Sequence, residues 1–221
     1  MTVIRQDDFI DSVADALQFI SYYHPLDFVK AVNEAYEREQ NPAARDAMAQ
    51  ILINSRMCAQ GHRPICQDTG IVTVFLKIGM DVQWDAEISV ADMVNEGVRR
   101  AYTHPDNVLR ASILEDPAGA RRNTKDNTPA VIHMEVIPGD TLDVQVAAKG
   151  GGSENKSKLA MLNPSDSIVD WVVKTIPTMG AGWCPPGMLG IGIGGTAEKA
   201  AVMAKEALMD PIDIHDLRKR G

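Results

Sequence analysis

Long apolar runs, a secretory leader and an excess of basic charge are all missing from this 221-residue sequence. No stretch approaches the ~20 consecutive apolar residues that a membrane-spanning helix needs. Residues 1–8 lack a basic segment followed by an apolar core, which a secretory signal would show. The net charge is −8 and the basic residues are scattered, whereas nucleic-acid binders usually carry a basic patch. We therefore expect a cytoplasmic protein with no membrane and no nucleic-acid partner.

Cysteine is also scarce, with only Cys58, Cys66 and Cys184 in the chain. A cytosolic chain argues against a disulfide framework, and no paired Cys-x-x-Cys marks a structural zinc site. Metal binding, catalysis and plain burial therefore stay open for each thiol. Hydrophobic content of 45% and charged content of 24% are ordinary for a globular protein, so a core of normal proportions can form.

Apolar spacing predicts a helical front over about residues 1–61. Its helices cover residues 9–20, residues 26–39 and a third segment that Asn41 and Pro42 open and Gly61 ends. The region of about 62–221 reads as α/β. The expected elements there are a buried strand over 71–78, a helix from a capping box at Ser89 to about Tyr102, a hairpin of strands 131–137 and 141–147, helices over about 165–176 and 196–209, and a glycine-rich strand over 188–195.

The predicted fold class is therefore α+β, a helical N-terminal part followed by a mixed β-sheet region flanked by helices. Between the expected helix ending at Tyr102 and the hairpin lies a polar stretch, residues 104–129. A loop of that length inside a compact domain is usually functional or disordered.

The first candidate site is the segment 63–70, Arg-Pro-Ile-Cys-Gln-Asp-Thr-Gly, in a turn between a helix end and a strand. The Cys66 thiolate could bind a soft metal, and Asp68 beside it could move protons. A capped turn with a buried cysteine explains the same residues about equally well.

Two further segments are rich in glycine. Residues 149–156, Lys-Gly-Gly-Gly-Ser-Glu-Asn-Lys, could bring backbone N–H groups close to an anion, or form a plain flexible turn. In residues 182–187, Gly-Trp-Cys-Pro-Pro-Gly, Cys184 is followed by two prolines that fix the backbone. Cys184 could be a metal ligand or a buried structural thiol. Residues 190–195 match G-x-G-x-x-G formally, but the rest of a dinucleotide-binding unit is not there, so these glycines are assigned to close packing.

In their order along the chain, these segments resemble the class I, iron–sulfur-dependent fumarate hydratases. The matching stretches are residues 65–70, residues 123–130 (Asn-Thr-Lys-Asp-Asn-Thr-Pro-Ala), residues 149–156 and residues 184–196. The α subunit of tartrate dehydratase is related and shares the Cys-Gln-Asp-Thr-Gly and Cys-Pro-Pro elements.

The resemblance implies a hydro-lyase that interconverts fumarate and (S)-malate on a 4Fe–4S cluster held by three cysteines, with one iron left open. It implies Cys66 and Cys184 as two cluster ligands, Gln67 and Asp68 as substrate contacts, and Asp68 as the catalytic proton carrier. Arg110 resembles an arginine that binds a substrate carboxylate, and Gly150 and Gly151 match a glycine loop at the substrate.

The family's third ligand follows the Cys-Pro-Pro-Gly segment, and Cys58 matches no ligand position. We therefore expect residues 1–221 to be an N-terminal α domain without its downstream half. It would be inactive alone and would work with a C-terminal domain or β subunit in a homodimeric enzyme. The alternatives are a subunit of a tartrate or other hydroxy-diacid dehydratase, and a non-catalytic fragment that binds an anion.

Overall fold

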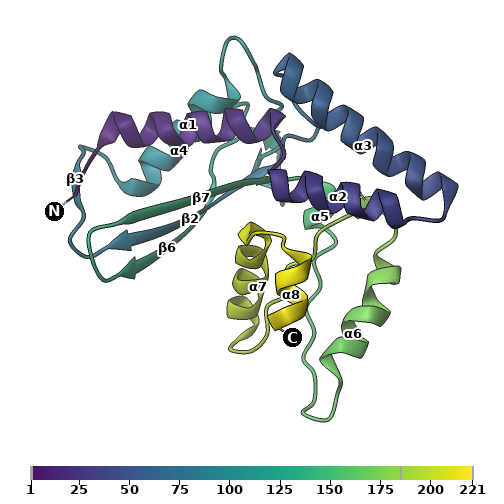
Figure 1. Cartoon of the computed structure of the whole chain (residues 1–221). Helices are drawn as coiled ribbons and strands as arrows, with labels where there is room; N and C mark the ends of the chain where they lie inside the picture. Colours follow the sequence, from purple (N-terminus) through teal and green to yellow (C-terminus); the bar gives the residue numbers. More distant parts are fainter. Residues whose placement is uncertain (1, 185, 221) are drawn as a thin grey trace. The chain divides into compact units, whose positions relative to one another are not determined.

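The computed structural model describes residues 2–184 and 186–220, and it has the expected α+β architecture, with helices followed by a mixed sheet (Figure 1). The chain divides into two compact units. The first comprises Met1–Lys149 with Pro211–Gly221, and the second comprises Gly150–Asp210. Among the described residues, no helix combines the length and apolar character needed to cross a membrane.

Four helices of the first unit follow the predicted pattern closely: α1 (Gln6–Tyr22), α2 (Leu26–Arg38), α3 (Pro42–Gly61) and α4 (Val90–Tyr102). This unit also contains α8 (Ile214–Arg220), which was not predicted. At the start of α3, the Asn41 side chain accepts hydrogen bonds from the amides of Ala43 and Ala44, as an N-cap should. The left-handed residue that ends α3 is His62, with φ 47°, so the chain turns one residue after the predicted stop at Gly61.

The central sheet has three strands, in the order β6 (Val131–Ile137), β2 (Ile71–Gly79) and β7 (Leu142–Lys149). Strand β2 pairs in parallel with β6 and antiparallel with β7, so the predicted hairpin of residues 131–137 with 141–147 is wrong. The reason lies in β2, whose Val72, Val74 and Leu76 are almost completely buried and whose two edges both need partners.

The connection from β6 to β7 closes over the end of β2 instead of forming a tight hairpin turn. The amides of Gly79, Met80 and Asp81 donate to the carbonyls of Thr141, Ile137 and Gly139 at 2.8–2.9 Å. Gly79 permits this approach, because a Cβ there would collide with the Gly139 carbonyl.

The core of the first unit lies where α1 and α4 cover one face of the sheet (Figure 1). Helix α4 contributes Met93, Val94, Val98, Ala101 and Tyr102, all at most 1% exposed. Gly97 lets the two helices approach closely, since a Cβ there would lie 2.8 Å from both the carbonyl oxygen of Ile10 and the side chain of Val13. This packing makes α4 a rigid support for the segments that follow it.

Two small strand pairs complete the first unit. Strand β1 (Val3–Arg5) pairs in parallel with β3 (Gln83–Asp85), and β4 (Leu114–Glu115) pairs antiparallel with β5 (Arg122–Asn123). The second pair lies inside the polar stretch 104–129, which is otherwise irregular as predicted.

The second unit contains α5 (Gly151–Glu154), α6 (Ile168–Thr175) and α7 (Ala197–Glu206), with 3-10 turns η1 (Ile176–Met179), η2 (Ala181–Trp183) and η3 (Ala207–Met209). The predicted strand over 188–195 is wrong, because these residues are irregular and carry no strand pairing. Gly190 and Gly192 instead pack on α7, where a Cβ on either would collide with the carbonyls of Ala204 and Ala200. Close packing of these glycines was expected within a strand, but they pack against helix α7.

Candidate functional site

The segment from Cys66 to Gly70 is the last part of the loop between α3 and β2, so it lies where the central strand of the sheet begins. Cys66 is exposed and free of any disulfide. Its thiol donates to Gln67 Oε1 at 3.4 Å, and its Sγ accepts the Asp68 amide at 3.4 Å. Backbone N–H donation to sulfur is one of the interactions that tune iron–sulfur thiolates. The loop therefore presents an accessible sulfur that already accepts such a bond.

Asp68 is half-buried beside this thiol. The Ser112 hydroxyl lies 3.5 Å from Asp68 Oδ1, at the limit of hydrogen-bond distance. The polar stretch therefore places a hydroxyl beside one carboxylate oxygen of Asp68. A half-buried carboxyl group next to an accessible thiol is suited to proton transfer.

The backbone of Arg110 contacts the same loop, although Arg110 lies 41 positions after Thr69 in the sequence. The Thr69 hydroxyl donates to the Arg110 carbonyl, which ties the backbone at Arg110 to the loop. The Arg110 side chain is exposed, as are Cys66 and Gln67. The first unit therefore brings together four of the residues predicted for the site: Cys66, Gln67, Asp68 and Arg110.

Further contacts to the loop come from two residues for which no separate role was predicted. The Tyr102 hydroxyl donates to the Thr69 carbonyl at 2.6 Å, and the Asn127 amide donates to the Gly70 carbonyl at 2.9 Å. Burial raises the pKa of Tyr102 above its usual value, so the hydroxyl stays protonated and able to donate. Asn127 lies in the stretch 123–130 that matches the family, and this match was the signal in the sequence that could have pointed to a role for it. Tyr102 ends an amphipathic helix, and nothing in the pattern separates it from an ordinary core tyrosine.

Asp126, next to Asn127, forms an ion pair with Arg99 of α4 at 3.0 Å. Burial raises the pKa of Asp126, but hydrogen bonds from the Thr128 amide, the Thr128 hydroxyl and Arg99 outweigh burial and place the pKa below its ordinary value. The carboxylate is therefore ionised at neutral pH and can anchor the segment to α4.

The remaining predicted residues, Gly150, Gly151 and Cys184, lie in the second unit. Gly150 is the extended N-cap residue of the four-residue helix α5, with φ −60° and ψ 142°, and Gly151 and Gly152 form its first turn, so the glycine segment is not an open loop. Gly152 contacts the turn η2, since a Cβ there would lie 2.7 Å from the Gly182 carbonyl oxygen. The glycine segment and the segment that carries Cys184 are therefore neighbours within this unit.

Cys184 is exposed and left-handed, with φ 60°, and its amide donates to the Ala181 carbonyl at 3.0 Å. Of the two prolines expected to fix the backbone here, Pro185 lies outside the described residues. Cys58 differs from the other cysteines because it is buried in α3, where its thiol lies 3.6 Å from Asn54 Oδ1 and 3.7 Å from the Pro64 carbonyl oxygen. Within residues 2–184 and 186–220, no three His, Cys, Asp or Glu side chains gather as a metal site.

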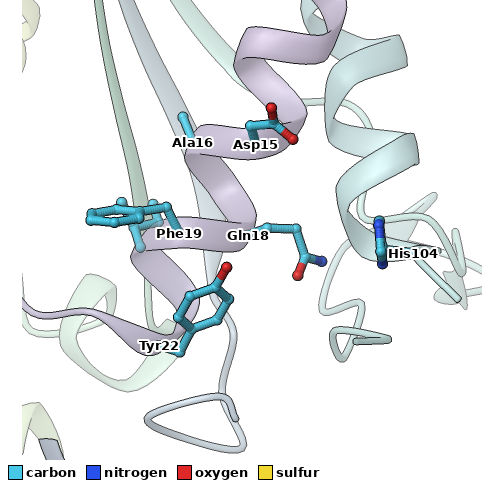
Figure 2. Close-up of a pocket in the computed structure, with 7 residues that line it drawn as sticks. Asp15, Ala16, Gln18, Phe19, Tyr22 and His104 are labelled. Carbon is cyan, nitrogen blue, oxygen red and sulfur yellow. The ribbon is translucent and has the colours of Figure 1, made fainter. Parts of the chain in front are cut away.

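A pocket of about 530 Å³ lies along α1, lined by Asp15, Gln18, Phe19, Tyr22 and His104 among others (Figure 2). It contains none of the predicted site residues. The Gln18 amide is already used within the protein, donating to the carbonyls of Ala101 and Asn107 at 2.6 and 3.0 Å. This pocket is therefore separate from the loop that carries Cys66 and Asp68.

Comparison with known proteins gives consistent matches across the chain. The family model "Fumarate hydratase (Fumerase)" matches residues 10–220. A putative L(+)-tartrate dehydratase subunit alpha of Methanocaldococcus jannaschii is 34% identical over 210 residues, which cover 91% of this chain and 72% of that protein. The L(+)-tartrate dehydratase subunits alpha of Escherichia coli and Shigella sonnei are each 27% identical over 204 residues, covering 90% of this chain. The matches span 66% of the length of these two relatives.

Proposed function

Because this chain belongs to the fumarate hydratase (Fumerase) family, we propose that it is part of a hydro-lyase acting on a short dicarboxylate. The preferred reaction is the reversible hydration of fumarate to (S)-malate. Dehydration of L(+)-tartrate is the second candidate, because the relatives that match are described as tartrate dehydratase α subunits. Their description as α subunits also supports a β subunit, or a downstream domain, as partner.

The observation that carries this proposal is the loop of Cys66, Gln67 and Asp68 with Arg110 beside it. The loop carries a thiol, an amide and a carboxylate, and its Thr69 hydroxyl donates to the backbone carbonyl of Arg110, whose side chain is exposed. Binding of a dianionic substrate needs local positive charge, because the protein as a whole carries a net charge of −8. The guanidinium of Arg110 suits a carboxylate, which it can bind through two parallel hydrogen bonds.

The chemistry of the donors also fits an iron–sulfur cluster. Cys66 and Cys184 are both exposed and free of disulfides, and Cys66 Sγ already accepts a backbone N–H. We propose these thiolates as two ligands of a 4Fe–4S cluster, with the third supplied by a partner chain or a further segment. When bound, the cluster would supply a Lewis acid at its open iron.

The residues of this chain would supply the proton transfer and the substrate contacts. In the hydration direction, the Asp68 carboxyl gives its proton to one carbon of the double bond, while the hydroxyl of water bonds to the other carbon. The remaining proton of that water restores the carboxyl, and dehydration runs the same transfers in reverse. Gln67 would orient the substrate by hydrogen bonds, and Gly150 and Gly151 would let the backbone approach it closely.

The test is the completed enzyme, with this chain co-expressed with its downstream partner and reconstituted anaerobically with iron and sulfide. Fumarate, (S)-malate and L(+)-tartrate are then assayed in parallel. Turnover of fumarate and malate supports the preferred reaction, and turnover of tartrate alone supports the second candidate. An iron-loaded complex that converts none of the three would refute both.

A further inference from the structure

Asn127 joins three segments that are distant in sequence. Its Nδ2 donates to the Gly70 carbonyl at 2.9 Å, and its Oδ1 accepts the amides of Ser112 and Ile113 at 2.6 and 3.3 Å. The residue is 0% exposed. We propose that Asn127 is a positioning residue that sets the Cys66–Gly70 loop against the backbone at Arg110–Ile113. As a role in catalysis, this inference rests on the proposed function.

The geometry requires asparagine at this position. A side chain here must donate one hydrogen bond and accept two. A terminal amide does this without charge and from two separate atoms, whereas a hydroxyl would have to make all three bonds from one oxygen. The backbone is also left-handed, with φ 63°, a conformation that asparagine tolerates better than larger or branched residues. Glutamine would meet the first requirement but adds a methylene to a buried position.

Helix α4 in turn fixes the segment that carries Asn127. On one side, Arg99 pairs with Asp126 at 3.0 Å. On the other side, Asn95 Oδ1 accepts the Ala130 amide at 2.9 Å. The same helix also reaches the loop directly through the Tyr102 hydroxyl. Asn127 is thus held at both flanks by a helix packed in the core, which is the support that a precisely placed site needs.

Two consequences follow for the site. The bond to Gly70 fixes the end of the loop that carries Cys66 and Asp68. The bonds to Ser112 and Ile113 fix the backbone just after Arg110, including the residue whose hydroxyl lies against Asp68. Loss of Asn127 should therefore make both the Cys66–Gly70 loop and the backbone at Arg110–Ile113 more mobile, while the core stays intact.

The experiment compares N127D and N127G in the full chain by hydrogen–deuterium exchange. N127D keeps the shape and the acceptor oxygen but replaces the N–H donor to Gly70 with a second oxygen. N127G keeps the left-handed backbone and adds no charge. V98A is the matched control for general destabilisation, since Val98 is a 0% exposed core residue of α4. N33D controls for an added negative charge together with a lost amide donor, because Asn33 is exposed and donates within α2 to Glu37 Oε1 at 3.1 Å.

We expect exchange of the amides at residues 66–70 to rise about tenfold in N127D and N127G relative to the core amides of α1 and β2. N33D should leave both sets unchanged, and V98A should raise both together. If N127D fails to fold, the exchange of residues 66–70 in N127G tests the proposal by itself. Exchange at 66–70 that rises only in step with the core would overturn the proposal, because Asn127 would then be an ordinary core residue.

In the completed enzyme, kcat should fall at least about tenfold in N127G and stay near normal in V98A at a temperature where both are folded. Equal kcat values in N127G and the unsubstituted enzyme would also overturn the proposal. If the unsubstituted enzyme converts no diacid, the proposed function fails, while the exchange measurement still decides whether Asn127 positions the loop.

Discussion

Gly70 offers a sharp test of how tightly the site loop is built into the sheet. Its backbone has φ +92°, and a Cβ added there would lie 2.6 Å from the Ala148 carbonyl carbon and 2.8 Å from the Lys149 amide nitrogen. Both are backbone atoms of β7, held in register by the pairing of Ile71 with Lys149. They cannot move away as the end of a flexible side chain could.

The magnitude follows from two costs. A left-handed conformation costs a residue with a Cβ about 1–2 kcal/mol. Forcing an extra methyl group into a filled space costs about 1–3 kcal/mol more. G70A should therefore lower the free energy of unfolding by roughly 2–5 kcal/mol.

Gly139 supplies the matched control, because its φ of +97° is nearly the same but nothing lies within 4 Å of an added Cβ. G139A should lose only the conformational part, about 1–2 kcal/mol. The reduced entropy of the unfolded chain is common to both variants and cancels in the difference. Urea unfolding followed by circular dichroism measures both values. If G70A and G139A lose the same free energy, the loop is not wedged against β7 and the reasoning is wrong.

The remaining predictions concern the proposed chemistry. D68N should lower turnover of the completed enzyme by roughly 10²-fold with little change in melting temperature, because it removes the proton carrier and keeps its shape; unchanged turnover would make Asp68 a turn residue. C66S and C184S should each abolish cluster-dependent activity in the completed enzyme, whereas C58A should keep its iron and lose only packing stability, as metal analysis and thermal melting would show. The chain alone should fold cooperatively but convert no fumarate after anaerobic reconstitution; a stable cluster with turnover from residues 1–221 would show that the chain completes the site itself.

Helices such as α1, α3 and α4 were predictable because their signals are local, whereas the short helices α5 and α8 were not predicted. Amphipathic spacing in α1, the Asn41 and Pro42 start of α3 and the Ser89 cap of α4 each act within a few residues. Strand pairing depends on contacts across the whole unit. The short connection between β6 and β7 favoured a hairpin, but the apolar β2, far earlier in the chain, takes the place between them.

The site shows the same division between local and distant information. The Cys-Gln-Asp-Thr-Gly motif pointed to the loop, and the structure brings Arg110 to it through a backbone contact. The matched stretch 123–130 could draw attention to Asn127, but the bonds that Asn127 and Tyr102 make could not be predicted, because their partners lie 57 and 33 positions earlier. Ligation of a cluster by Cys66 and Cys184 stays a prediction, as do the substrate contacts of Gln67, Gly150 and Gly151.

Helix α4 connects stability to function through two stripes of side chains. Val94, Val98 and Ala101 face the core, at intervals of four and three residues. Asn95, Arg99 and Tyr102 follow the same intervals one residue later, and each bonds to a segment of the site. Because both stripes belong to one rigid helix, a shift of α4 against α1 would move the loop of Asp68 and the segment of Asn127 together. Gly97, which sets how closely α4 approaches α1, therefore influences the geometry of the proposed site without touching it.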